Sequence, residues 1–144
     1  MSVTARAFFY IQQVEQLVRR RLDECLQPDG ITAGQYMVMN LIIHLEPVSS
    51  AELARRANMT AQSMGEFIKN LEAKQYITRT TDPTNRRVIK VSLTPEGRNL
   101  MVRCESKVDQ AERDFFDCLS GEENAQMRFL LSRVRSIQLA RRGE

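Results

Sequence analysis

Residues 76–97 read YITRTTDPTNRRVIKVSLTPEG, and this stretch decides how the rest of the chain is interpreted. Two runs rich in β-branched residues flank the polar hexapeptide DPTNRR at 82–87. In the second run apolar and polar residues alternate, with Ile89, Val91 and Leu93 on one face, which is typical of a β-strand. The stretch therefore predicts a β-hairpin with two adjacent arginines at its tip.

The segment before the hairpin, SSAELARRANMTAQSMGEFIKNLEAK at 49–74, predicts two short helices separated by a tight turn. Ser49 and Glu52 have the spacing of a capping box at the start of the first helix. Asn58 tolerates a left-handed backbone and ends that helix, and Thr60 caps the second one. Two short helices joined in this way form a helix-turn-helix.

Longer amphipathic helices are predicted on both sides of this central part. From Val3 to Leu26, and again from Leu100 to Cys118, apolar residues recur at three- and four-residue steps, and a final helix follows. Stop and start signals separate the elements: QPDG at 27–30, TAGQ at 32–35, TPEG at 94–97 and SGEE at 120–123. The chain is therefore predicted to be mainly α-helical with one small hairpin.

The composition favours one globular domain with reduced cysteines. The chain has 144 residues, of which 42% are hydrophobic and 27% charged. No apolar run is long enough to span a membrane, and the N-terminus MSVTARAFFYIQQ does not have the form of a secretory signal. The three cysteines show no C-x-x-C spacing. We therefore expect a cytoplasmic protein.

Positive charge is concentrated in the central part of the chain. Residues 49–98 contain nine Lys or Arg and five Asp or Glu, a net charge of +4, whereas the remainder carries −1. This distribution is a modest electrostatic footprint for a polyanion, although a random fluctuation of surface charge explains it equally well.

Taken together, the order of these segments resembles the multiple-antibiotic-resistance-regulator (MarR) family of winged helix-turn-helix transcriptional regulators. The resemblance extends over nearly the whole chain and includes ITAGQYMVMNLI at 31–42. Its most specific part is the pattern D-P-x-D-R-R followed by L-T-x-x-G, which residues 82–97 match except at Asn85. Leu71 with Glu72 before the first strand of the hairpin, and Arg79 ahead of Asp82, also fit the family.

The resemblance implies one domain over 1–144 that works as a homodimer. Residues 32–93 would form the winged helix-turn-helix portion, and residues 3–27 and 94–142 the dimerisation helices. The apolar surface of these flanking helices is too extensive for the small winged portion to cover, which agrees with this expectation. The dimer would place two recognition helices about 34 Å apart on palindromic double-stranded DNA.

The DNA contacts implied by the family lie on a recognition helix at 60–74 and a wing at 82–87. The helix would enter the major groove, and the wing arginines would enter the neighbouring minor groove. The candidate DNA-binding residues are Ser49, Thr60, Ala61, Gln62, Ser63, Lys69, Arg79, Arg86, Arg87 and Lys90.

Two positions depart from the family pattern. Asn85 replaces an aspartate that braces the wing in relatives, and Asp82 is a substitute brace for Arg86 or Arg87. Glu66 occupies a position that is often basic or neutral. Either the helix turns Glu66 away from DNA, or its carboxylate accepts a hydrogen bond from cytosine N4 and helps sequence choice, and the sequence leaves both interpretations open.

The family commonly releases DNA when a small molecule binds between the dimerisation helices and the winged portion. Aromatic carboxylates and their thioesters are the expected effectors. The candidate effector-binding residues are Phe8, Phe9, Ile11, Arg19, Met37, His44 and Cys104, although Phe and Met at helical spacing usually form a core.

The sequence bears on three alternatives to this function. A regulator of the same fold could sense oxidants through Cys25, but no obvious pair of basic residues lowers the pKa of that thiol. A winged-helix module for protein contacts alone would not need the basic excess of residues 49–98. An enzyme is not expected, because His44 is the single histidine and no catalytic triad, metal cluster or phosphate-binding loop is present. No cofactor or metal is predicted.

Overall fold

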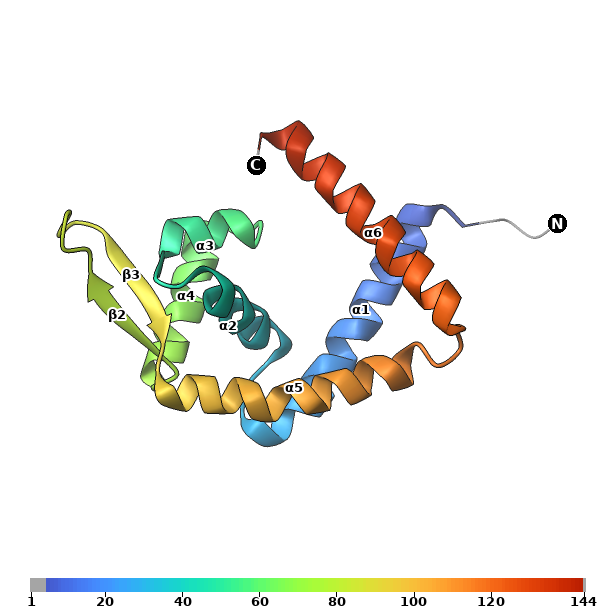
Figure 1. Cartoon of the computed structure of the whole chain (residues 1–144), viewed down its shortest axis with the longest axis horizontal. Helices are drawn as coiled ribbons and strands as arrows, with labels where there is room; N and C mark the ends of the chain where they lie inside the picture. Colours follow the sequence, from blue (N-terminus) through green and yellow to red (C-terminus); the bar gives the residue numbers. More distant parts are fainter. Residues whose placement is uncertain (1–4, 144) are drawn as a thin grey trace. The chain divides into compact units, whose positions relative to one another are not determined.

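The computed structural model describes residues 5–143, and its elements follow the predicted order (Figure 1). The elements are α1 (Ala7–Leu26), a 3₁₀ turn (Gln27–Asp29), α2 (Ala33–Leu45), β1 (Val48–Ser49), α3 (Ser50–Arg56), α4 (Ala61–Ala73), β2 (Ile77–Thr81), β3 (Ile89–Leu93), α5 (Pro95–Phe115) and α6 (Gly121–Arg142). The fold is mainly helical with a small antiparallel sheet, as predicted. The chain divides into two compact units, one up to Asp109 and one from Gln110 onwards, and α5 contributes to both.

Side-chain caps begin most of the helices where the sequence predicted them. Reciprocal capping boxes open α2 (Thr32 with Gln35) and α6 (Ser120 with Glu123), and the Thr60 hydroxyl accepts a hydrogen bond from the Ser63 amide at the start of α4. Gly30 and Asn58 adopt the predicted left-handed backbone, with φ of 74° and 54°. These confirmed signals all act within four residues along the chain, so the sequence displays them directly.

The predicted capping box at α3 is only half formed. The Ser49 hydroxyl accepts a hydrogen bond from the Glu52 amide at 3.2 Å, as expected. The Glu52 carboxylate does not return to the backbone of Ser49; it binds the guanidinium groups of Arg55 and Arg56 instead. The two arginines thus occupy the carboxylate that would complete the capping box.

The sheet has three strands in the order β1-β3-β2, and both pairs are antiparallel. The hairpin register pairs Ile77 with Leu93 and Thr81 with Ile89. On the other edge of β3, the two-residue strand β1 pairs Val48 with Val91. No pattern in the sequence predicts β1, because a strand of two residues is too short to show a periodicity and forms only by pairing with β3.

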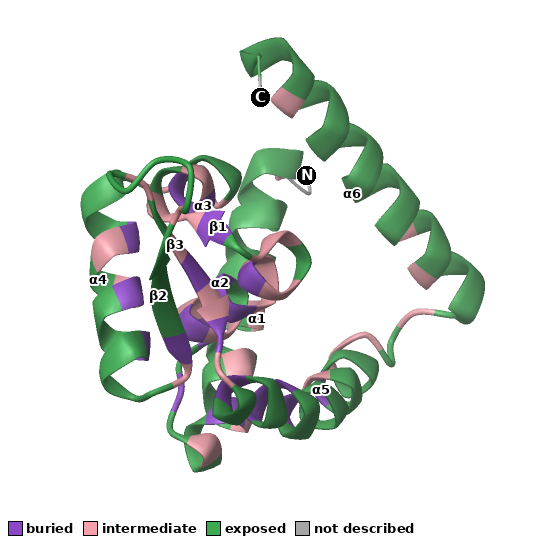
Figure 2. Cartoon of the chain, turned by 60° about the vertical axis from the view of Figure 1, so that its left-hand side comes forward, coloured by how far each residue is buried: buried purple, intermediate pink, exposed green. Residues whose placement is uncertain are grey.

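The core of the first unit lies where α2, α3 and α4 meet β3 and the first half of α5 (Figure 2). Its fully buried side chains include Leu26, Met39, Ile42, Leu53, Met64, Ile68, Leu71, Leu100 and Cys104. The buried arc of α4 is thereby fixed against the core, and the opposite arc is exposed.

Two glycines allow close packing around the helix-turn-helix, whereas a third, inside α4, does not. A Cβ atom on Gly34 would lie 2.7 Å from Cζ of Phe67, so the absence of a side chain lets the Phe67 ring of α4 approach α2. At Gly97 a Cβ atom would overlap the carbonyl oxygen of Tyr76. A glycine inside a helix costs about 1 kcal/mol relative to alanine and so predicts a close neighbour at Gly65. A Cβ atom on Gly65 would have nothing within 4 Å, so this prediction from the sequence is wrong.

The end of α5 also differs from the prediction. The helix ends at Phe115, and Cys118 lies beyond it as an exposed residue rather than on the apolar stripe. The three residues after Phe115 form a turn that leads to the Ser120 cap of α6. The regular spacing of apolar residues continues to Cys118, so it cannot show that the helix ends at Phe115 before the turn to the next cap.

Two helices expose many apolar side chains. On α6, which has no buried residue, these are Phe129, Leu130, Leu131, Val134 and Ile137. On α1 they are Phe8, Phe9, Tyr10, Ile11, Val14 and Leu17. Val3, which the sequence placed on the stripe of the first helix, lies outside the described residues. An exposed apolar stripe along a whole helix is unusual in a monomer.

Candidate nucleic-acid interface

Helix α4 presents a polar face to solvent opposite its buried face. Met64, Ile68 and Leu71 are buried at three- and four-residue spacing, which anchors the helix. The predicted contact residues Thr60, Ala61, Gln62, Ser63 and Lys69 are all exposed. Since the N-terminal turn of α4 carries four of them, the structure brings these side chains together on one surface.

The wing tip is held by Asp82 and Asn85 rather than by its arginines. Oδ1 of Asp82 accepts hydrogen bonds from the amide of Thr84 at 2.9 Å and from its hydroxyl at 2.7 Å. Oδ1 of Asn85 accepts from the amide of Arg87 at 3.2 Å. The backbone closes the turn through Asp82 N–H to the Val88 carbonyl at 3.0 Å.

This arrangement corrects the expected brace. Asp82 does not hold Arg86 or Arg87; its second oxygen lies 3.6 Å from Nζ of Lys90. The hydrogen bonds from Thr84, together with the Lys90 ammonium, lower the pKa of Asp82 below its ordinary value. Neither arginine side chain forms a hydrogen bond or ion pair with any residue between 5 and 143, so both guanidinium groups stay available to a ligand.

Other predicted contact residues are engaged within the protein. Arg79 forms an ion pair with Glu72 at 2.8 Å, and Lys90 is paired with Asp82. Ser49 is half-buried and its hydroxyl caps α3. These three residues support the interface from within, and a contact with DNA would require Arg79 and Lys90 to share their charge with an internal partner.

Lys74, which the sequence placed at the end of the recognition helix, also has an internal role. Its ammonium donates to the carbonyl of Gly30 at 2.6 Å and to Oε1 of Gln35 at 3.3 Å. The C-terminal end of α4 is thereby joined to the loop between α1 and α2. The sequence could not show this contact, because it joins residues 44 positions apart.

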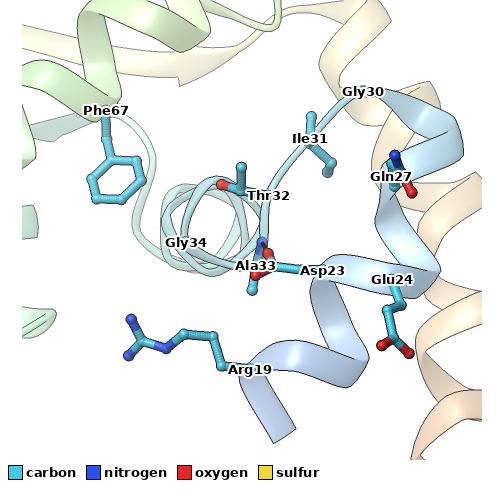
Figure 3. A pocket seen from close by; sticks show the side chains of 10 residues that line it. All are labelled: Arg19, Asp23, Glu24, Gln27, Gly30, Ile31, Thr32, Ala33, Gly34 and Phe67. Carbon is cyan, nitrogen blue, oxygen red and sulfur yellow. Dashed lines mark hydrogen bonds between the residues drawn. The ribbon is translucent and has the colours of Figure 1, made fainter. Parts of the chain in front are cut away.

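A cavity of about 590 Å³ lies beside this junction (Figure 3). Arg19 from α1 and the ring of Phe67 from α4 both face it, and the backbone around Gly34 forms another part of its wall. Its full lining is Arg19, Asp23, Glu24, Gln27, Gly30, Ile31, Thr32, Ala33, Gly34 and Phe67.

Of the predicted effector-binding residues, only Arg19 lines this cavity. Phe8, Phe9, Ile11, Met37 and His44 are exposed and do not line it, and Cys104 is fully buried in the core. The structure therefore does not bring the seven residues together. Phe67 and Asp23 were missed because the sequence marks them only as a core aromatic and a solvated acid.

The two cysteines of the first unit have little thiolate character. Burial raises the pKa of the Cys25 thiol and likewise that of Cys104. A thiol reacts with oxidants mainly as the thiolate, so a raised pKa argues against the redox alternative. Within residues 5–143, no cluster of His, Cys, Asp or Glu could hold a metal ion, and no helix is both long and apolar enough to cross a membrane.

Comparisons with known proteins agree with this architecture. The MarR family model matches residues 31–89. An HTH-type transcriptional repressor from Mycobacterium tuberculosis is 26% identical over 128 residues, which is 89% of this chain and 92% of the repressor. Apo wild-type MarR from E. coli superposes with a TM-score of 0.82 at 25% identity, over 92% of this chain and 98% of that one.

The structure of a relative bound to DNA shows the same fold. A mutant MarR from E. coli complexed with operator DNA superposes with a TM-score of 0.81 at 26% identity, over 87% of this chain and 90% of that one. The matched family model spans the helix-turn-helix and the wing, and the superposed structures extend the likeness to the flanking helices. The chain belongs to the MarR family of winged helix-turn-helix transcriptional regulators.

Proposed function

We propose that this protein is a homodimeric, ligand-responsive transcriptional repressor that binds palindromic operator DNA. The observation that carries the proposal is the pairing of an exposed polar face on α4 with a wing tip whose two arginines have no partner among the described residues. The relatives named above include a transcriptional repressor and a regulator bound to operator DNA, which supports the same conclusion.

In this proposal the two contact regions have different roles. The N-terminal turn of α4 lies in the major groove, where Gln62 can bond adenine through two hydrogen bonds and Thr60 and Ser63 can donate to phosphate or bases. Arg86 and Arg87 reach the adjacent minor groove and respond to its negative potential. With DNA as the partner, we place the protein in the cytoplasm.

Removal of one wing arginine tests the proposal directly. Arg87→Ala is expected to weaken binding to DNA flanking the protein's own gene, and to make log K fall less steeply with log salt, by about one unit per arginine removed, because fewer counterions are released. Fluorescence anisotropy over a series of salt concentrations measures both quantities.

Arg20→Ala is the matched control, because it removes the same charge from an exposed position on α1. It is expected to leave the affinity and the salt slope unchanged. Equal binding by the Arg87 variant and the unmodified protein would overturn the assignment of the wing. Absence of salt-dependent binding by the unmodified protein would favour the module for protein contacts alone.

The effector in this proposal is a small molecule, with aromatic carboxylates and their thioesters as the expected class. The cavity beside Arg19 and Phe67 supports a ligand site, since its walls come from α1, α2 and α4. A ligand there would contact the recognition helix itself and couple its occupancy to DNA release. The same assay, repeated with a panel of aromatic acids and thioesters, tests this class.

Treatment with peroxide distinguishes redox sensing through Cys25 from release by a small-molecule effector. Release by peroxide with recovery in dithiothreitol would support it, whereas the raised pKa of the Cys25 thiol leads us to expect no response.

A further inference from the structure

Glu66 points straight out of the face of α4 that the proposed function assigns to DNA. With about 100° between successive helical residues, its side chain projects about 170° from the middle of the buried arc formed by Met64, Ile68 and Leu71. Gln62 lies one turn before it on the same exposed face. The structure thus excludes the interpretation in which the helix turns Glu66 away from the ligand.

Glu66 is also the acidic residue of the winged portion whose negative charge is not balanced by a neighbouring positive charge. The other acids between residues 49 and 98 are compensated: Glu52 by Arg55 and Arg56, Glu72 by Arg79, Asp82 by Lys90, and Glu96 by its place in the first turn of α5. Glu66 forms no ion pair or hydrogen bond with any described residue, although Lys69 lies one turn further along.

An unpaired carboxylate on this face is repelled by DNA phosphates, so it weakens binding to most sequences. The major groove offers it two kinds of hydrogen-bond donor, the N4 amino group of cytosine and the N6 amino group of adenine. Adenine places its N7 acceptor beside N6, which repels the second carboxylate oxygen. Cytosine presents N4 without such an acceptor on the same base, so cytosine is the base that suits Glu66.

We propose that Glu66 is a specificity-determining residue that accepts a hydrogen bond from the N4 amino group of a cytosine in each operator half-site. The inference rests on the proposed function and adds to it a base preference at the position facing the second turn of α4. Glu66 then works in two directions, since it favours one C·G pair and disfavours DNA that lacks it. Such repulsion of wrong partners sharpens discrimination without any gain in affinity.

The test selects duplexes from a randomised library with the full-length protein and with Glu66→Ala, Glu66→Gln and Glu96→Gln. The unmodified protein is expected to select cytosine at one position of each half-site, and to lose about tenfold in affinity when that C·G pair is replaced. Glu66→Ala is expected to bind unselected DNA more tightly and to reduce this loss to less than twofold.

Glu66→Gln is expected to shift the selected base from cytosine towards adenine, because an amide can donate to N7 while it accepts from N6. Glu96→Gln removes the same charge from outside the recognition helix and is expected to keep the cytosine preference. Because Glu66 is exposed and forms no hydrogen bond or ion pair with a described residue, both of its variants are expected to melt at the temperature of the unmodified protein.

The possible results separate this inference from the proposed function. If Glu66→Ala selects the same bases with the same preferences, and its affinity rises equally for all duplexes, Glu66 is a repulsive charge alone and the inference is wrong. If the unmodified protein selects no sequence and binds no duplex in a salt-dependent way, the proposed function is wrong, and the inference with it.

Discussion

Gly97 shows how a single absent side chain positions the start of α5 against the wing. The amide of Thr94 donates to the carbonyl of Tyr76 at 3.0 Å, and the Thr94 hydroxyl accepts from the amide of Gly97 at 3.0 Å. A Cβ atom on Gly97 would overlap that same carbonyl. The glycine of LTPEG is therefore required for close packing between the first turn of α5 and the backbone before β2.

Substitution of this glycine is expected to destabilise the protein strongly. Gly97→Ala should lower the free energy of unfolding by about 2 kcal/mol or more, because the obstacle is backbone that cannot rotate aside. Urea denaturation measures the change. Gly65→Ala is the matched control, since Gly65 lies inside a helix with open space around it.

The control is expected to act in the opposite direction. Gly65→Ala should raise the free energy of unfolding by about 0.5–1 kcal/mol through helix propensity. Equal effects of the two substitutions would contradict the contact with Tyr76.

Among the secondary-structure elements, α4 is held at both ends by hydrogen bonds, one local in the sequence and one between distant segments. Its first turn depends on the Thr60 hydroxyl, which accepts from the Ser63 amide at 3.1 Å. Its last turn depends on Lys74, whose ammonium reaches the loop before α2. The recognition helix is thus capped locally at the end that would face DNA, and tied to the rest of the unit at the other.

The local cap makes a separate prediction. Thr60→Ala is expected to lower the free energy of unfolding in the absence of DNA by about 1 kcal/mol, since an alanine leaves the Ser63 amide without its partner. Thr60→Ser keeps the hydroxyl and is expected to change stability little. If alanine and serine gave the same stability, the cap would contribute nothing measurable. Urea denaturation monitored by circular dichroism compares the variants.

The wing is a second element whose shape depends on short-range bonds. Asp82 and Asn85 hold the backbone of the tip, which leaves both arginine side chains unengaged within the described chain. The neutral Asn85 can hold the tip without a charge, because the bond it accepts comes from a backbone amide and needs only an acceptor oxygen. The departure from the family pattern therefore leaves the tip closed.

For the whole molecule, the exposed apolar helices are the strongest sign of a second copy. Helix α6 has no buried residue, and α1 exposes six large apolar side chains. A second chain would remove this surface from water, which is the dominant driving force for association. Each of the two units of the chain carries part of this exposed apolar surface.

Light scattering of the purified protein is expected to give twice the chain mass of 16.6 kDa. Val134→Glu places a charge within the apolar surface of α6, and should dissociate the dimer and weaken operator binding. Ser132→Glu introduces the same carboxylate at an exposed position about 160° around that helix from Val134 and should leave the dimer intact. A mass of 16.6 kDa for the unmodified protein would overturn the dimer.

The order of the elements, most of their caps and the hairpin could be predicted from the amino-acid sequence, because these features depend on contacts within a few residues. The sequence also identified the family through 82–97, where the backbone needs particular residues at particular positions. The pairing of β1 with β3, the partner of Asp82 and the residues around the cavity could be seen only in the folded chain. Each of these depends on packing between segments or on a choice among several available charges, and neither leaves a periodic signal in the sequence.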